Sequence, residues 1–253
     1  MDSRFGKKLR KKFLMGELYF YPKPGDTVID VGACTGDMSY YYSLRVEDKG
    51  KVYSIEPSIT NYRTIRNKYR DVRNIKAFNI ALGSKNEKET LYLSNDSSHH
   101  SMDKNFNWNK EHNANIGSEE VDVKTLDTFI EEQKIDRVDI ISMNVEGSEL
   151  NILKGFEKSI NKLSPAIYIH AHTNELIKSC SELLNIYGYV IIPFKNNNLY
   201  AIKGNIEFLE DKSKKSIKCL LCNNKINELE SIKFDELCFD CYFDLMTKWT
   251  TKL

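Results

Sequence analysis

The stretch VIDVGACTGD, residues 28–37, decides the fold class, because an apolar run passes directly into a turn with two glycines. Residues 27–31 and residues 52–55 are apolar runs of strand length. Between them lies a short aromatic face at helical spacing, formed by Met38, Tyr41, Tyr42 and Leu44. A strand, a glycine turn, a helix and a second strand in this order predict the first unit of a parallel α/β sheet.

The same alternation continues as far as residue 203. A second helix, capped by Ser58, is expected where apolar residues recur at three-and-four spacing, at Ile59, Tyr62, Ile65, Tyr69 and Val72. Further strands are expected at residues 75–79, 137–145 and 166–172, followed by a helical face at residues 177–184 and a hairpin at residues 189–194 and 199–203. The sequence therefore predicts an α/β fold with a parallel sheet covered on both sides and closed by an antiparallel hairpin.

One segment, residues 95–118, interrupts this pattern. It is rich in Asn and His, includes Phe106 and Trp108, and has no periodicity. Long loops inside compact domains are typically lids, binding loops or disordered insertions. The two aromatic residues favour a lid, and a disordered insertion is the alternative.

Composition excludes some classes of protein. The 253 residues carry a formal net charge of +1, which gives no general electrostatic argument for nucleic-acid binding. No apolar run reaches the roughly 18 residues of a membrane span, and the N-terminus lacks a secretory signal, so we expect a soluble, cytoplasmic protein. Two basic clusters, at residues 7–12 and 212–218, are either solvated segments or contacts for RNA or another anionic surface.

The glycine turn narrows the class of ligand. A dinucleotide site requires Gly-x-Gly-x-x-Gly, and Cys34 stands where the second glycine would be. A phosphate-binding loop with Gly-Lys-Ser/Thr is absent from the sequence. Glu56 ends the second strand, twenty residues after Gly36, where a carboxylate can accept both hydroxyls of a ribose. A ligand with a ribose and an amino-acid tail fits these residues better than NAD does, and S-adenosylmethionine is such a ligand. The alternative for Glu56 is an exposed acid at a strand end with no role in binding.

The order of five motifs is more specific than the turn alone. VIDVGACTG, SIEP, NIALG, VDIISMNVEGSELNILKG and PAIYIHAH follow one another between residues 13 and 203. This arrangement resembles the FkbM-type family of S-adenosylmethionine-dependent methyltransferases, and the Asn-Val-Glu-Gly-x-Glu segment is its most specific part. The resemblance implies a class I, Rossmann-like methyltransferase with a seven-stranded, mostly parallel sheet ending in an antiparallel hairpin. It also implies methylation of an oxygen, commonly on a sugar or a secondary metabolite.

The resemblance also assigns cofactor-binding residues by position. The methionine part would be lined by Asp30, Gly32, Ala33 and Gly36, and the ribose would be bound by Glu56 with Pro57 beside it. Asn79 and Ala81 would lie near the adenine, and Asn144 would face the methyl-donor end.

The expected catalytic residues lie at the ends of the later strands. A hydroxyl with a pKa of about 15.7 needs a base or a metal to lose its proton, and the candidates there are Glu146, His170 and His172. His170 and His172 alternate on the predicted strand and should point to the same side, although histidines held within the core are the alternative. Glu146 could be a base, a metal ligand or a helix cap.

The sequence also departs from the family pattern. Ser142 and Asn144 replace a Lys and an Asp, and Tyr168 replaces a Glu. The loss of two carboxylates weakens a mechanism that uses a divalent metal. It also leaves open a scaffold that binds S-adenosylmethionine without turnover.

Four cysteines near the C-terminus have the spacing of a zinc site. The pairs Cys219/Cys222 and Cys238/Cys241 are separated by fifteen residues. Disulfides fit poorly with an intracellular chain that has two further cysteines, and four thiolates leave no open catalytic position, so we expect structural zinc. We therefore expect a basic segment at 1–12, a methyltransferase domain at 13–204, a linker at 205–218 and a zinc module at 219–253.

The predicted activity is O-methylation of a small-molecule or glycan hydroxyl with S-adenosylmethionine as cofactor. The first alternative is an RNA-modifying methyltransferase that binds RNA through the zinc module. The second is the non-catalytic scaffold. The sequence does not indicate an oligomeric state.

Overall fold

The computed structural model describes residues 22–104, 115–194, 198–203, 216–218 and 225–227. The chain divides into one unit of residues 22–203 and a second of residues 1–21 and 204–253. In the second unit the described residues form a two-stranded antiparallel ladder of β11 (Ser216–Lys218) and β12 (Lys225–Asn227), and β11 falls within the predicted linker. The four predicted zinc ligands, Cys219, Cys222, Cys238 and Cys241, and the predicted basic segment at 1–12 lie outside the described residues.

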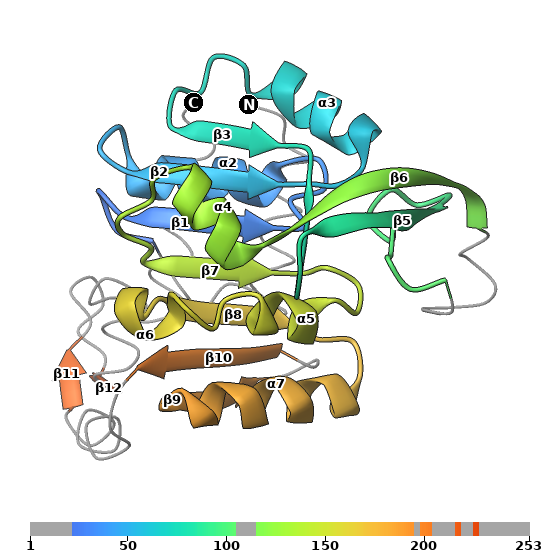
Figure 1. Cartoon of the computed structure of the whole chain (residues 1–253). Coiled ribbons are helices and arrows are strands. Elements are labelled where there is room, and N and C mark those ends of the chain that lie inside the picture. Colours follow the sequence, from blue (N-terminus) through green and yellow to red (C-terminus); the bar gives the residue numbers. More distant parts are fainter. Residues whose placement is uncertain (1–21, 105–114, 195–197, 204–215, 219–224, 228–253) are drawn as a thin grey trace. The chain divides into compact units, whose positions relative to one another are not determined.

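A seven-stranded sheet with the order β3-β2-β1-β7-β8-β10-β9 forms the centre of the larger unit (Figure 1). Its strands are β1 (Thr27–Val31), β2 (Lys51–Ile55), β3 (Ile75–Phe78), β7 (Ile140–Met143), β8 (Ala166–His170), β9 (Tyr189–Phe194) and β10 (Asn198–Lys203). The first five are parallel, and β10 is antiparallel to both β8 and β9. The predicted mostly parallel sheet with a terminal antiparallel hairpin is confirmed.

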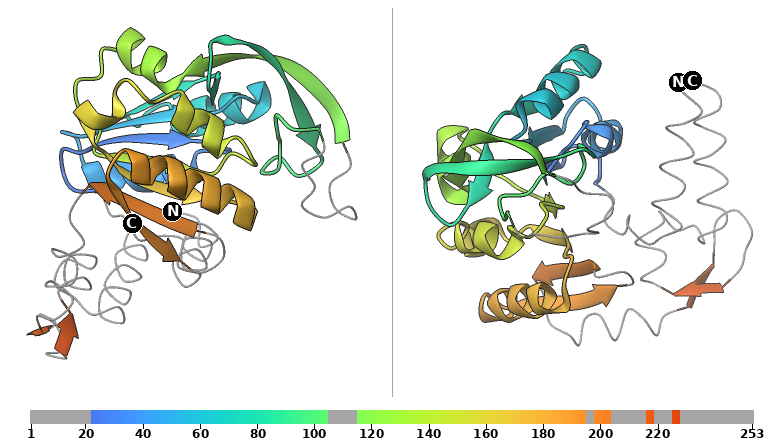
Figure 2. Two further views of the ribbon diagram at one scale, coloured as in Figure 1. Left: turned by 60° about the horizontal axis from the view of Figure 1, so that its bottom comes forward. Right: turned by 90° about the vertical axis from the view of Figure 1, so that its right-hand side faces the viewer.

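Helices cover the sheet on both faces, as Figure 1 and the edge-on view of Figure 2 show. The helices are α2 (Asp37–Val46), α3 (Ile59–Lys68), α4 (Leu126–Glu132), α5 (Glu149–Lys154), α6 (Ile160–Leu163) and α7 (Asn174–Ile186). α4 to α7 lie in front of the sheet in Figure 1, and α2 lies behind β1 and β2. The central strands are mostly apolar because both of their faces are covered, and Ile29, Ile141 and Ile167 are fully buried.

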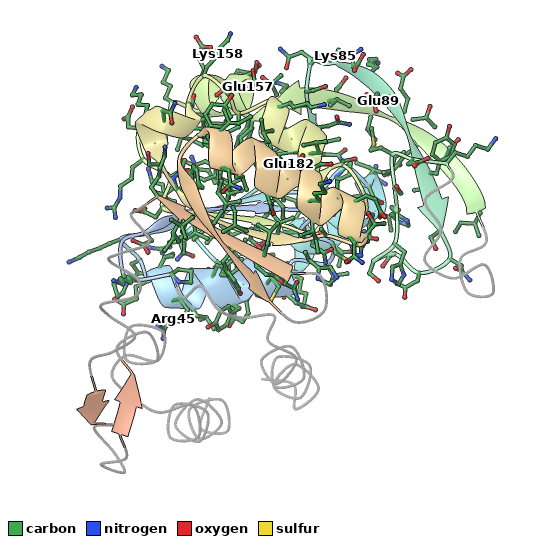
Figure 3. All side chains as sticks on the ribbon, turned by 90° about the horizontal axis from the view of Figure 1, so that it is seen from below. Arg45, Lys85, Glu89, Glu157, Lys158 and Glu182 are labelled. Atoms are coloured by element: carbon green, nitrogen blue, oxygen red, sulfur yellow. The ribbon has the colours of Figure 1, made fainter. Side chains whose placement is uncertain are left out.

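Charged side chains lie on the surface of the larger unit. Lys85, Glu89, Glu157, Lys158 and Glu182 are exposed and point outward in Figure 3. None of the helices in the described part of the chain has the length and apolar character that a membrane crossing requires.

A second sheet was not predicted from the sequence. Its order is β4-β6-β5, with β4 (Ala81–Gly83), β5 (Glu87–Ser94) and β6 (Asn115–Thr125), and in Figure 1 β5 and β6 extend away from the main sheet. β5 begins with exposed, mostly charged residues, and its apolar contribution to the small core is Leu91 with Leu93 packed at its edge. The aperiodic segment therefore ends earlier than expected, because its last four residues are part of β6.

Three local expectations need correction. β7 and β8 are shorter than the predicted runs 137–145 and 166–172, so His172 lies beyond the end of β8. Ser58 occupies the N-cap position of α3, but its side chain makes no capping hydrogen bond; the backbone N–H of Ile59 donates instead to Glu119 Oε1 at 3.1 Å. Leu44 is 50% exposed and does not belong to the buried face of α2.

Candidate functional site

The strand order reverses at β1, which has β2 on one side and β7 on the other. In open α/β sheets ligands bind at the carboxyl ends of the strands at such a reversal. An open pocket lies there. Its walls come from the glycine turn after β1, from the ends of β2 and β3, and from the turn after β7. The topology alone therefore brings together segments that are more than 100 residues apart in the sequence.

The glycine turn packs directly against the turn after β7. Gly32 has a φ of 77°, and a Cβ added there would lie 2.1 Å from the carbonyl oxygen of Asn144. Its N–H donates to Ile55 O at 3.0 Å, which ties the turn to β2 as well. A glycine is required here because any side chain would separate the two backbone segments that form the pocket floor.

Glu56, after the end of β2, contacts the glycine turn and lines the pocket. Its Oε2 accepts from the backbone N–H of Cys34 at 2.8 Å, and its Oε1 accepts from the backbone N–H of Ser58 at 3.0 Å. Burial raises the pKa of Glu56 to about 7, against the effect of these hydrogen bonds. Cys34, at the position of the missing glycine, has a φ of 51° and also lines the pocket.

The predicted cofactor residues divide into two groups. Gly32, Glu56, Pro57, Ala81 and Asn144 line the pocket. Four other predicted residues, Asp30, Ala33, Gly36 and Asn79, do not line it.

Each of these four residues has a structural contact. Asp30 is buried on β1 and accepts from Ser39 Oγ at 2.5 Å. Asn79 Nδ2 donates to the carbonyl oxygens of Glu56 and Pro57 at 3.1 and 2.6 Å. Ala33 belongs to a small buried cluster around Ile65 and Tyr69, and a Cβ on Gly36 would lie 2.9 Å from the Tyr69 ring. These residues fix the backbone around the pocket.

The turn after β7 presents two polar side chains. Asn144 and Glu146 both line the pocket, and Glu146 has a φ of 55°, which a non-glycine residue rarely adopts. Gly147 follows with a φ of 107°, and Glu149 then begins α5 with its side chain fully buried. Burial raises the pKa of Glu149 to about 7, and the nearby backbone N–H groups of residues 149, 145 and 147 act in the opposite direction.

The two predicted histidines lie next to this turn. His172 Nε2 is 3.2 Å from Asn144 Oδ1 and 3.5 Å from Glu146 Oε2. Burial, followed by the neighbouring His170 and His99, lowers the pKa of His172 to about 3. The rings of His170 and His172 contact each other edge to face, with centroids 4.6 Å apart.

Asn198, at the start of β10, contacts the ring of His170. The distance from His170 Nδ1 to Asn198 Oδ1 is 2.6 Å, and the same oxygen accepts from Tyr168 Oη at 2.7 Å. Neither histidine lines the pocket; His172 contacts the lining residues Glu146 and Asn144, and His170 contacts the ring of His172. Among the described residues there is no group of three or more His, Cys, Asp or Glu placed to hold a metal ion.

The sequence analysis missed a further wall of the pocket. Residues 94–102, which we call the strap, cross from the glycine-turn side to the turn after β7. Ser97 O accepts from Asn61 Nδ2 at 2.9 Å, and at the other end Ser101 Oγ donates to Glu146 O at 2.8 Å. The strap residues that line the pocket are Ser97, Ser98, His100 and Met102. The cluster Ser-Ser-His-His, at residues 97–100 of the aperiodic segment, was the available signal in the sequence.

The chain is similar to several solved proteins. A solved FkbM methyltransferase from Methylobacillus flagellatus KT is 24% identical, with a TM-score of 0.51 over 75% of this chain and 46% of that one, so the present chain spans less than half of its length. Fibrillarin from Aeropyrum pernix, solved with natively bound S-adenosyl-L-methionine, is 16% identical with a TM-score of 0.47 over 77% of this chain and 74% of that one. A methyltransferase from Aquifex aeolicus is 17% identical, with a TM-score of 0.42 over 79% and 89% of the two chains.

No curated protein matches the chain in sequence. The sequence model of the Methyltransferase FkbM domain, in contrast, matches residues 30–200, which include both sides of the pocket, the strap and both histidines. The chain therefore belongs to the FkbM methyltransferase domain family.

Proposed function

We propose that this domain transfers the methyl group of S-adenosylmethionine to a hydroxyl of a sugar, a glycan or a secondary metabolite. The observation that carries the proposal is a single pocket with a buried carboxylate on one side of β1 and a histidine–carboxylate contact on the other. Glu56 supplies the first, and Glu146 with His172 supplies the second.

The chemistry of the pocket fits the cofactor. Glu56 is a buried carboxylate at a strand end, where it can accept hydrogen bonds from the two ribose hydroxyls. The turn at Gly32 brings backbone close to the pocket floor, which leaves room for the amino-acid part. Pro57 and Ala81 would lie beside the nucleoside, and Asn144 would lie at the sulfonium end. Asp30, Ala33, Gly36 and Asn79 would support this wall from behind.

When bound, S-adenosylmethionine supplies a methyl group on a positively charged sulfur. The residues of the chain then have to orient the acceptor hydroxyl in line with that bond and remove its proton. Water around a bound acceptor would compete for both tasks, and the strap forms part of the pocket wall that would limit its access.

His170 is the proposed base. An amide oxygen only accepts hydrogen bonds, so the contact with Asn198 Oδ1 requires a hydrogen on Nδ1 of His170. A neutral ring in this tautomer has its lone pair on Nε2, the nitrogen that can take a proton. Asn198 would therefore act as the positioning residue for the base.

Glu146 and His172 would orient the acceptor. His172 stays neutral at neutral pH because burial lowers its pKa to about 3, and its contact with Asn144 Oδ1 requires a hydrogen on Nε2. The Glu146 carboxylate lies on the pocket wall, where it can accept a hydrogen bond from the substrate hydroxyl or from a neighbouring one.

Calorimetric titration with S-adenosylmethionine and, separately, NAD tests the cofactor, with Glu56→Gln as the variant. We expect saturable binding of S-adenosylmethionine alone and a loss of about tenfold or more in the variant, since two hydrogen bonds to a buried carboxylate are removed. Transfer of a labelled methyl group to a panel of sugars, with His170→Ala as the inactive control, then tests the hydroxyl acceptor. Methylation of RNA with no methylation of sugars would favour the RNA-modifying alternative, and binding without any product would favour the scaffold.

The C-terminal cysteines carry a separate proposal that rests on their spacing. Cys219, Cys222, Cys238 and Cys241 would hold one structural zinc ion in a module at residues 219–253, after a linker at 205–218. Metal analysis of the purified chain should give one zinc per chain, and Cys238→Ser should remove it. A cytoplasmic location, in a reducing compartment, is part of the same proposal.

A further inference from the structure

His100, on the strap, carries an inference beyond the proposed reaction. Its Nδ1 accepts a hydrogen bond from the backbone N–H of Ser94 at 3.0 Å. A nitrogen that accepts cannot carry a hydrogen, so the neutral ring must carry it on Nε2. Burial lowers the pKa of His100, which keeps the ring in this neutral form. The backbone of β5 thus fixes His100 as a hydrogen-bond donor with one available N–H.

The available N–H of His100 has no partner among the described residues, although the ring lines the pocket. A buried or half-buried donor without a partner is costly, so polar groups in pockets are typically satisfied by a ligand or by water. The position within the pocket indicates what kind of ligand atom it would meet.

An apolar surface lies next to His100. Ala81, Leu91 and Met102 pack together in one small cluster and all three line the pocket. This surface begins at Ala81, the first residue of β4, just past the end of β3, where the family resemblance places the adenine. A flat aromatic base would rest on such a surface, with its edge accessible to a neighbouring polar group.

We infer that His100 is a specificity-determining residue, whose Nε2–H donates to a ring nitrogen of the adenine base in the nucleoside end of the pocket. The inference rests on the proposed function, because it requires S-adenosylmethionine in this pocket. A neutral donor recognises the lone pair of a ring nitrogen and rejects a base that presents C–H at the same position. The strap therefore serves as the base-recognition wall and not only as a cover.

The test uses S-adenosylhomocysteine and its three deaza analogues, each with one acceptor nitrogen of the base replaced by C–H. Calorimetry with the full, unmodified chain should show about tenfold weaker binding for one analogue, since one hydrogen bond of ordinary strength is lost. His100→Leu should weaken natural S-adenosylhomocysteine by a similar factor and leave that one analogue unaffected. His100→Gln should retain most of the affinity, because the amide N–H can replace Nε2–H.

His99→Gln is the matched control, since His99 is the adjacent strap residue and does not line the pocket. It should bind all four ligands as the unmodified chain does. Equal losses for every ligand in His100→Leu, or no loss in any, would overturn the assignment of His100 while leaving the cofactor pocket intact. A wild-type chain that binds no S-adenosylhomocysteine would overturn the proposed function itself. The comparison of analogues on the wild-type chain needs no variant, so it holds even where His100→Leu fails to fold.

Discussion

The imidazole of His172 lies 3.5 Å from the carboxylate of Glu146, with 5% of one side chain and 7% of the other exposed to solvent. The two would form an ion pair only with a protonated ring. Burial lowers the pKa of His172 to about 3, so at neutral pH the ring is neutral and the Glu146 carboxylate lies beside an imidazole that carries no charge.

The same shift makes the folded state sensitive to acid. Between pH 6.5 and about 3 the unfolded chain binds a proton at His172 that the folded chain does not, so this contribution to stability falls as pH falls through that window. His172→Gln should remove this dependence. The measurement is the melting temperature of wild type minus variant at a series of pH values. The difference should decrease on acidification; a flat difference would show that the ring is accessible to protons in the folded chain.

Cofactor affinity should depend on pH through Glu56. Burial raises the pKa of this carboxyl to about 7, and ribose hydroxyls are accepted by the ionised form. Binding of S-adenosylhomocysteine should therefore strengthen by about tenfold between about pH 6 and about pH 8. Glu56→Gln should bind weakly and without this dependence. Equal slopes for wild type and variant would assign the pH dependence to another group.

Glu149 should control the stability of the turn that presents Glu146. Its folded pKa is raised from 4.5 to about 7, so the folded chain binds an extra proton between these values and this contribution to stability is lost as pH rises through about 7. Glu149→Gln keeps the shape without the charge and should unfold at a higher urea concentration than wild type above neutral pH. Glu149→Ala leaves a cavity at the start of α5 and should cost about 2 kcal/mol or more at any pH. Stabilisation by both substitutions would contradict this account.

The main sheet could be predicted because its central strands are short runs of mostly apolar residues. Val28–Val31 and Ile140–Met143 are buried on both faces, so nearly every residue is apolar and the run is visible without any structure. β5 has no such signal. Its first half, from Glu87, is largely exposed and charged. It is stabilised by pairing with β6 across the 20 residues that separate the two strands, and local sequence does not reveal such a pairing.

The candidate site also has a part that the sequence predicts and a part that it does not. Gly32, Glu56 and Asn144 lie at strand ends, where topology alone predicts a ligand, and they do line the pocket. The strap could not be predicted to line the pocket from the sequence. The hydrogen bond between Asn61 and Ser97 that holds it joins two segments far apart in the chain, and no repeating pattern in the sequence marks such a contact. Its role follows only from tertiary contacts.

Asn198 should determine which nitrogen of His170 carries the hydrogen. Its Oδ1 lies 2.6 Å from His170 Nδ1 and also accepts from Tyr168 Oη. Asn198→Ala removes the acceptor and should lower kcat by about tenfold or more without changing the affinity for S-adenosylhomocysteine. Nitrogen NMR of the imidazole should show the Nδ1–H tautomer in wild type and a mixture in this variant. Tyr168→Phe keeps the contact between Asn198 and His170, so it should preserve the wild-type tautomer; an Nε2–H ring in the wild-type chain would remove His170 from the role of base.

Alanine substitutions at Gly32 and Gly25 distinguish two causes of instability: a left-handed backbone conformation and a close contact with another segment. Both have positive φ values, 77° and 87°, so alanine is strained at either position. A Cβ on Gly25 would meet nothing within 4 Å, and Gly25→Ala should cost about 1–2 kcal/mol from the left-handed conformation alone. A Cβ on Gly32 would lie 2.1 Å from Asn144 O, so Gly32→Ala must also push the two turns apart and should cost about 3 kcal/mol or more. Urea unfolding gives both free energies. Calorimetry should show lost cofactor binding only for Gly32→Ala, because only that substitution displaces the floor of the pocket. Equal costs for the two substitutions would mean that the turn after β7 moves aside without a loss of stability.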